Sequence, residues 1–298
     1  MSDFRLKVFR SVAKNLSFTK ASQELFVSQP AITKHIQELE AAYQTRLFDR
    51  QGSRISLTES GNLLLEHCER ILEDYKRLEY EMHLLHNEYT GGLKLGASTT
   101  IAQYVLPPLL ASFIGKFPQV SLSLLNGNSR EIEAALQEHR IDLGFVEGVF
   151  RLPNIRYTTF LEDELVAVVR TGSKLAVGEE ITPDELFHLP LVLRERGSGT
   201  LDVFERALQQ HNIKLSSLQV LMYLGSTESS RMFLEHTDCL GIVSVRSITR
   251  ELYSGQLRVV EIKGMPMLRD FSFAQPQGQE SGLAQVFMQF AMHNNHKL

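Results

Sequence analysis

The sequence predicts an α+β multidomain fold made of three consecutive segments. They are a small N-terminal domain of short helices and a hairpin, one long helix, and a larger body in which strands and helices alternate. Three observations carry this prediction. Residues 17–39 have the pattern of two short helices joined by a tight turn, and residues 58–89 contain no proline and repeat apolar residues at steps of four and three. From Gly91 onward, short apolar runs alternate with helical patterns.

Residues 17–39 contain start signals for two helices. Ser17 and Ser28 can each cap a helix, and Pro30 falls in the first turn of the second, where a missing N–H costs little. Apolar residues of both helices fall on inward faces; these are Phe18, Ala21, Leu25, Ile32, Ile36 and Leu39. The opposite face of the second helix carries Gln29, Pro30, Thr33, Lys34 and Gln37, whose polar groups can read base edges in a major groove. The alternative is an all-α domain in which these side chains are merely solvated.

The residues that follow favour DNA binding. Leu47-Phe48 and Ile55 with Leu57 flank the turn signal 51–53, which predicts a small hairpin that can lay Arg50 and Arg54 along a phosphate backbone. Residues 1–57 hold nine lysines and arginines against five acidic residues, whereas the whole chain has a net charge of −4. A basic N-terminal segment followed by an acidic remainder of the chain is expected of a protein that binds the phosphate groups of DNA through its N-terminal segment.

The string SFTKASQELFVSQPAITKHIQELE, followed by RLFDR and SLTESG, resembles the winged helix-turn-helix of LysR-type transcriptional regulators. The resemblance extends over essentially the full length. It supports double-stranded DNA as a partner, and the residues expected to bind it are Ser28, Gln29, Pro30, Thr33, Lys34, Arg50 and Arg54. Phe26 stands where a turn glycine is common, and Tyr43-Gln44 replace the usual Leu-Gly at the end of the second helix. Phe26 or Gln44 should therefore adopt a left-handed turn conformation.

A long linker helix is expected to begin after Thr58, a suitable cap, and to continue to about residue 90. Its seam residues recur in heptads and are Leu64, Cys68, Ile71, Tyr75, Leu78, Met82, Leu85 and Tyr89. We expect this seam to form a homodimer, and the resemblance also implies a dimer of dimers. The alternative is a helix that packs against its own domain. His83 and His86 lack a nearby third ligand, so no metal site is expected.

From residue 91 to residue 298 the pattern indicates parallel strands covered by helices. Strands are predicted at 93–97, 120–125, 143–146, 162–169, 191–193, 220–224 and 240–244, and helices at 99–116, 129–138, 200–211 and 226–235. The resemblance implies a two-lobed, periplasmic-binding-protein-like effector domain. Lobe 1 would hold about 91–161 and 267–298, and lobe 2 about 162–266.

Hydroxyls and glycines cluster just after strands in both lobes, where open α/β folds bind ligands. Several clusters start helices, whose free N–H groups and positive dipole end attract anions. The expected effector-binding residues are Ser98, Thr99, Thr100, Asn126, Gly127, Asn128, Glu147, Gly197, Ser198, Thr200 and Thr227. The alternative is that each residue merely caps its helix. Glu147 would repel an anion unless one partner carries a proton, which favours a ligand such as bisulfite or a hydrogen phosphate ester.

The stretch LRERGSGT, residues 193–200, resembles family members that regulate cysteine and sulfur-oxyanion metabolism and carbon fixation. Arg196 replaces their usual proline, and it either adds charge near the pocket or faces solvent. Cys68 and Cys239 form neither a disulfide framework nor a metal-ligand spacing. A peroxide sensor of the family would need a cysteine pair in the effector domain, which has only Cys239.

Two other functional classes are disfavoured by the sequence. An enzyme built on the α/β lobes is opposed by the absence of a nucleophile elbow, a phosphate-cradling loop with Lys-Ser/Thr, or HExxH. A solute-binding transport protein is opposed by a charged N-terminus without a signal peptide. The longest apolar stretch, near 104–115, is short and contains Pro107-Pro108, so no membrane span is expected. The leading expectation is a cytoplasmic, ligand-responsive transcription factor without a cofactor, and RNA polymerase would be a further partner.

Overall fold

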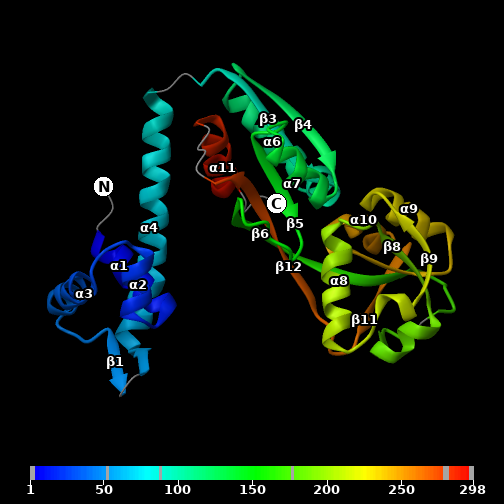
Figure 1. Ribbon diagram of the computed structural model, residues 1–298, viewed down its shortest axis with the longest axis horizontal. Coiled ribbons are helices and arrows are strands. Elements are labelled where there is room, and N and C mark those ends of the chain that lie inside the picture. Colours follow the sequence, from blue (N-terminus) through cyan, green and yellow to red (C-terminus); the bar gives the residue numbers. More distant parts are fainter. Residues whose placement is uncertain (1–3, 52–53, 87–88, 176–177, 278–281, 295–298) are drawn as a thin grey trace. The chain divides into compact units, whose positions relative to one another are not determined.

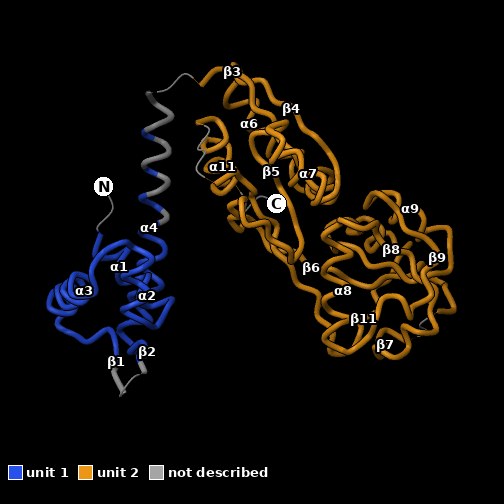
Figure 2. The backbone as a smooth tube through the Cα atoms, in the orientation of Figure 1, with its two compact units in different colours: residues 1–88 blue, residues 89–298 orange. Residues whose placement is uncertain are grey.

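The computed structural model describes residues 4–51, 54–86, 89–175, 178–277 and 282–294 (Figure 1). Within these ranges it does not describe the side chains of residues 50, 51, 54, 73, 76, 77, 79–81 and 83–86. The chain divides into two compact units, residues 1–88 and 89–298 (Figure 2).

The first unit begins with three helices around one apolar core. They are α1 (Phe4–Asn15), α2 (Phe18–Glu24) and α3 (Gln29–Tyr43). Ser17 and Ser28 cap α2 and α3 as predicted, each accepting a hydrogen bond from a backbone N–H in the first turn. The predicted inward residues of α3, Ile32, Ile36 and Leu39, are buried. The rings of Phe9 and Phe18 both pack on Phe48, which fixes the following hairpin against the helices.

Both suspected turn positions adopt the left-handed conformation. Phe26 has φ +55° in the turn between α2 and α3, and its side chain is 95% exposed. Gln44 has φ +52° and ends α3 by donating its N–H to carbonyls of the last turn. The chain therefore makes both turns without glycine, at a modest conformational cost.

The predicted hairpin consists of β1 (Phe48–Gln51) and β2 (Arg54–Leu57), paired antiparallel with Phe48 opposite Leu57. The long helix α4 (Glu59–His86) follows. Thr58 caps it, because its hydroxyl accepts a hydrogen bond from the Gly61 N–H and donates one to the Arg46 carbonyl. Gly61 is required here, since a Cβ at this position would lie 2.2 Å from the Leu47 carbonyl oxygen.

Two residues of the predicted heptad seam, Cys68 and Tyr89, differ from expectation. Cys68 is fully buried in the core of the first unit and its thiol contacts the Leu6 carbonyl at 3.3 Å, so it faces α1 rather than a partner helix. Tyr89 lies beyond the end of α4, and its ring packs on Phe117 of the second unit. In the middle of the seam, Ile71, Leu78 and Met82 are exposed.

The second unit is built on one sheet in which ten described strands pair. The path through it is β4-β3-β5-β12-β6-β10-β8-β9; β11 also pairs with β6, and β7 pairs with β11. The strands are β3 (Gly91–Ser98), β4 (Val120–Gly127), β5 (Leu143–Glu147), β6 (Ile155–Arg170), β7 (Glu180–Ile181), β8 (Pro190–Arg194), β9 (Gln219–Leu224), β10 (Leu240–Ser244), β11 (Leu257–Ile262) and β12 (Met267–Pro276). Strands β3, β4 and β5 are parallel to one another, as are β8, β9 and β10.

Helices cover these two parallel groups and make two lobes (Figure 1). The first lobe has α5 (Thr99–Tyr104), α6 (Leu106–Lys116), α7 (Ser129–Gln137) and α11 (Gly282–Asn294). The second has α8 (Gly199–Gln210), α9 (Thr227–His236), α10 (Thr249–Tyr253) and the short 3₁₀ helices η1 (Pro183–His188), η2 (Leu215–Ser217) and η3 (Val245–Ser247). The long antiparallel strands β6 and β12 run through both lobes and join them.

Two predicted elements need correction. Residues 99–116 are two helices rather than one, because the chain turns at Val105 and Pro107-Pro108 can occupy only the first turn of a new helix. The predicted strand 162–169 is the second half of β6, which starts at Ile155. In its first half only Ile155 and Phe160 are buried, and their spacing follows neither an apolar run nor an alternation, so this half gave a weak signal. No helix in the described part of the chain combines the length and the apolar character needed to cross a membrane.

Candidate functional sites

The exposed face of α3 carries the predicted DNA-reading residues. Gln29, Pro30 and Lys34 are exposed, and Thr33 is half-buried; its hydroxyl donates a hydrogen bond of 3.1 Å to the Gln29 carbonyl. The Ser28 hydroxyl accepts the Ala31 N–H at 3.4 Å, so it serves as a helix cap that is still exposed. The predicted phosphate-binding side chains of Arg50 and Arg54 lie outside the described residues, although their backbones belong to β1 and β2.

Most of the predicted effector residues come together between the two lobes of the second unit. Ser98 ends β3, Thr99 and Thr100 start α5, and Glu147 ends β5 in the first lobe. Thr200 and Thr227 start α8 and α9 in the second lobe. All six side chains are buried, with exposures of 0–5%. The hydroxyls after the parallel strands therefore meet as the strand-end rule predicted.

The Thr227 hydroxyl is the centre of this cluster. It lies 3.1 Å from the Thr99 hydroxyl and 3.0 Å from the Thr100 hydroxyl, and both contacts cross from one lobe to the other. The Arg194 guanidinium donates a third hydrogen bond to the same oxygen at 2.8 Å. Three hydrogen-bond partners around one buried oxygen fix its position closely.

Glu147 forms the other half of the cluster. Its carboxylate accepts a short hydrogen bond from Ser98, and its backbone exchanges hydrogen bonds with the Ser129 hydroxyl. Gly199 sits directly against it, because a Cβ on Gly199 would lie 2.3 Å from the Glu147 carbonyl oxygen. Glu147 thus occupies the N-terminal end of α8, where the helix dipole favours negative charge.

Five predicted residues have other roles in the structure. Asn128 forms a capping box with Glu131 at the start of α7, and the Ser198 hydroxyl caps α8 by accepting the Leu201 N–H at 3.3 Å. Asn126 is exposed on β4, unlike the buried residues of the cluster, and Gly127 ends the same strand. Gly197 has φ +94°, and its carbonyl accepts the Arg130 N–H at 3.2 Å, a further contact between the lobes.

Sequence reasoning missed two buried arginines beside this cluster. Arg194, the last residue of β8, is 3% exposed and makes a two-pronged ion pair with Glu195 at 2.8 and 3.0 Å. Arg269 on β12 pairs with Asp163 at 2.7 Å, donates to Thr200 at 3.0 Å and lies 3.5 Å from the Glu147 carboxylate. One of its terminal nitrogens, Nη2, is buried without a hydrogen-bond partner among the described residues.

A signal for both arginines was present in the sequence. In β12 the buried residues Met267, Arg269 and Phe271 alternate with the exposed residues Leu268 and Asp270, so Arg269 stands on an apolar face. In β8 Arg194 ends an almost continuously buried strand. A charge at a buried strand position requires a partner, which makes such a position a candidate for function. The partner Asp163 could not be found from sequence, since it depends on the register that places it opposite Arg269.

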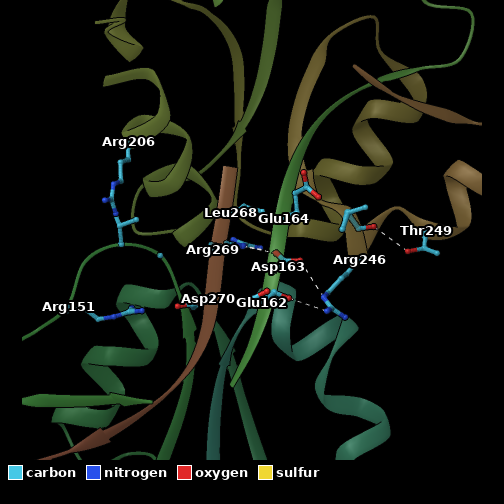
Figure 3. A pocket seen from close by; sticks show the side chains of 13 residues that line it. Arg151, Glu162, Asp163, Glu164, Arg206, Arg246, Thr249, Leu268, Arg269 and Asp270 are labelled. Atoms are coloured by element: carbon cyan, nitrogen blue, oxygen red, sulfur yellow. Dashed lines mark hydrogen bonds and ion pairs between the residues drawn. The ribbon is translucent and has the colours of Figure 1, made fainter. Parts of the chain in front are cut away.

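A cavity of about 760 Å³ lies along the β6–β12 ribbon at the level of these charges (Figure 3). Its lining includes Arg151, Arg206, Arg246, Glu162 and Asp270, together with Asp163 and Arg269. Figure 3 shows Arg151 and Arg206 on one side of the ribbon and Arg246 with Thr249 on the other. The predicted effector residues do not line this cavity, and Thr99 and Thr100 contact Thr227 directly instead. The buried cluster is the stronger candidate site, because its polar groups converge on one another.

A second polar contact joins the lobes near the cluster. The Tyr104 hydroxyl of α5 donates a hydrogen bond of 2.5 Å to the Glu228 carboxylate of α9. Arg231 holds Glu228 from the other side and also pairs with Glu235 and Glu251. The Arg231 hydrogen bond, followed by the Tyr104 hydrogen bond, lowers the pKa of Glu228, so this carboxylate stays ionised at neutral pH.

Arg196 and the two cysteines lie in contrasting environments. Arg196 faces solvent, with its side chain 73% exposed and paired to Glu205 at 3.1 Å. Cys68 and Cys239 are free and buried, and burial raises the pKa of each thiol to about 11. Buried thiols of this kind are poor nucleophiles at neutral pH.

Two family models match the chain. "Bacterial regulatory helix-turn-helix protein, lysR family" matches residues 4–62, and "LysR substrate binding domain" matches residues 86–295. The RuBisCO operon transcriptional regulator of Acidithiobacillus ferrooxidans is 30% identical over 287 residues, covering 96% of this chain and 92% of that protein. The HTH-type transcriptional regulator CysL of Bacillus subtilis is 28% identical over 268 residues, covering 90% and 89%. The regulatory domain of Synechocystis PCC6803 CcmR, solved in complex with 2-PG, aligns with a TM-score of 0.62 at 27% identity, covering 68% of this chain and 97% of that one.

Proposed function

Because the chain belongs to the LysR family of transcriptional regulators, as its sequence resemblance predicted, we propose that a small oxyanion bound between the two lobes modulates its binding to operator DNA. Residues 1–57 would contact DNA, residues 58–90 would link and dimerise the subunits, and residues 91–298 would bind the effector. A dimer of dimers and contact with RNA polymerase are further parts of the proposal.

The observation that carries the effector proposal is the buried cluster of Thr99, Thr100 and Thr227 beside Arg194 and Arg269. Hydroxyls and guanidinium groups are hydrogen-bond donors suited to oxyanions, and guanidinium groups are weakly hydrated enough to function inside a protein. The free Nη2 of Arg269 adds an unused donor at the same place. The complex of CcmR with 2-PG gives one relative whose regulatory domain binds a small molecule.

Glu147 narrows the class of ligand. Its buried carboxylate would repel an anion that only accepts hydrogen bonds, whereas an anion that also carries a proton can donate to it. Bisulfite and hydrogen phosphate esters have both properties. Arg194, Arg269 and Arg246 are already matched in charge by Glu195, Asp163 and Glu147, which favours a ligand of low net charge.

Isothermal calorimetry on the full chain tests the proposal. The ligands are sulfite, sulfate, thiosulfate, inorganic phosphate, 2-PG and small carboxylates. Thr100→Val is nearly isosteric and should weaken binding of the preferred anion about tenfold to a hundredfold, since one hydrogen bond to a charged ligand is lost. Ser198→Ala provides a comparison, because the structure uses that hydroxyl as a helix cap.

The two possible failures of this experiment mean different things. If no anion binds the wild-type protein, the oxyanion proposal is wrong. If an anion binds and Thr100→Val leaves the affinity unchanged, the anion binds elsewhere, and the cavity along the β6–β12 ribbon becomes the next candidate. Glu147→Gln should in addition reduce the preference for protonated over fully deprotonated anions.

A further inference from the structure

The three threonines of the cluster share a limited number of protons. A hydroxyl has one proton to donate and two lone pairs that accept. The Thr227 oxygen has three partners, Arg194, Thr99 and Thr100. An arginine guanidinium can only donate, so Arg194 takes one lone pair of Thr227.

This fixes the direction of the other two hydrogen bonds. One threonine of the pair Thr99 and Thr100 donates to the second lone pair of Thr227. The other must accept the Thr227 proton, since the oxygen has no third lone pair. That accepting threonine keeps its own proton, for which the described part of the chain shows no acceptor. Both threonines are at most 5% exposed, so this proton is buried and costs free energy while it has no partner.

We infer that Arg194 is a positioning residue that orders these hydroxyl protons, so that one threonine at the start of α5 always presents a free donor to the effector. The inference rests on the effector site proposed above and explains why that site would prefer an acceptor such as an oxyanion. Arg194 can hold this role because its other nitrogens are fixed by Glu195 and by the Leu224 carbonyl at 3.2 Å.

Without Arg194 the order is lost. Thr227 could then accept from both Thr99 and Thr100, and both would turn only lone pairs toward the ligand. An anion that carries no proton would find no hydroxyl donor there. An anion that retains a proton could instead donate to one of the threonines.

Sulfate and inorganic phosphate at pH 8 test this inference by calorimetry on the full chain. Both are then mainly dianions of similar size, so losing the positive charge of Arg194 should weaken the binding of both alike. Only phosphate retains an O–H group. Arg194→Met should lower the ratio of sulfate to phosphate affinity about tenfold or more, the usual value of a hydrogen bond to a charged group. The matched control is Arg196→Met, two residues along the same segment and facing solvent, which should leave the ratio unchanged.

Thr227→Val serves as the second variant and should act in the opposite direction. It keeps Arg194 but frees the protons of both Thr99 and Thr100, so the ratio should stay the same or rise. Equal weakening of both anions by Arg194→Met, or a fall in the ratio with Thr227→Val, would show that Arg194 has only a structural role. If neither dianion binds the wild-type protein, this inference is wrong, whereas the oxyanion proposal is decided separately by the wider set of anions in the first calorimetry experiment.

Discussion

At the scale of single residues, two helical glycines of this chain should respond in opposite ways to the same substitution. Gly61→Ala would place a methyl group against the backbone of Leu47, which cannot move aside as a flexible side chain could. We expect a loss of about 1–3 kcal/mol in the stability of the first unit. Gly115 in α6 has open space where a methyl group would lie, with no atom within 4 Å, so Gly115→Ala should stabilise the second unit by roughly 0.4–1 kcal/mol.

Urea unfolding of the full chain, followed by circular dichroism, measures both effects. Gly115→Ala is the control for the substitution itself, because it adds the same methyl group to another helix. A Gly61→Ala protein as stable as the wild type would mean that α4 does not approach residue 47 as closely as the structure indicates.

At the scale of elements, α3 and the β1–β2 hairpin should divide the work of DNA binding. Gln29→Ala removes a group that can pair with adenine, so it should relax sequence preference, at about 1–3 kcal/mol per lost base contact. Arg54→Ala removes a charge expected at a phosphate, so it should weaken binding to all sequences and flatten the salt dependence.

Dissociation constants on operator and random DNA over a range of salt concentrations separate these outcomes. Lys214→Ala, an exposed basic residue of the second unit, is the control and should change neither quantity. If Gln29→Ala and Arg54→Ala alter both DNAs by the same factor, the proposed division is wrong.

The exposed part of the α4 seam should form the interface between the two subunits of a dimer. Ile71, Leu78 and Met82 recur at steps of seven and four, and all three remain exposed in the single chain. Leu78→Glu should therefore split the dimer, because it would bury a charge between two helices. Leu63→Glu is the matched control, since Leu63 is exposed on the same helix but off the seam. Sedimentation equilibrium measures the oligomeric state of both variants. If the dimer survives Leu78→Glu but not Leu63→Glu, the dimer interface lies on the face of α4 that carries Leu63.

The elements of this chain differ in how far the sequence could predict them. The helix-turn-helix was predictable residue by residue, because caps at Ser17 and Ser28 and the spacing of Ile32, Ile36 and Leu39 are local signals. The first half of β6 was not, since its buried residues follow no regular period and its pairing partner β12 lies more than a hundred residues away. The threonines of the buried cluster were predictable from strand ends. The pairing of Arg269 with Asp163 could not be predicted from the sequence, because that contact depends on the β6–β12 register.

At the scale of the whole effector unit, contacts made directly between the lobes hold the arrangement seen in the structure; we call this arrangement closed, and one without these contacts open. Besides the threonine cluster, these include the bond from Tyr104 to Glu228 and the backbone contact of Arg130 with Gly197. A ligand that bridges the lobes gains affinity in proportion to the population of the arrangement it binds. The contacts between the lobes should therefore influence effector binding even where they do not touch the effector.

Tyr104→Phe tests this coupling. It removes a hydrogen bond to an ionised carboxylate across the lobes, but Glu228 is 43% exposed, so solvent screening reduces the effect to about 1 kcal/mol. Affinity for the effector should fall roughly threefold to tenfold if the open arrangement is appreciably populated. Backbone hydrogen exchange should also become faster in α5 and α9, which lose one of their hydrogen bonds to each other and keep those of the threonine cluster.

Tyr157→Phe is a closely matched control, because the Tyr157 hydroxyl donates a hydrogen bond of the same 2.5 Å to Glu133 within the first lobe. It should lower stability without changing effector affinity or exchange in α9. Since Arg231 lowers the pKa of Glu228, the Tyr104 contact should persist as the pH falls from 8 to 6 and weaken only below the ordinary carboxylate range. Equal effects of the two substitutions on effector affinity would mean that the Tyr104–Glu228 contact contributes to stability but not to the coupling between the lobes.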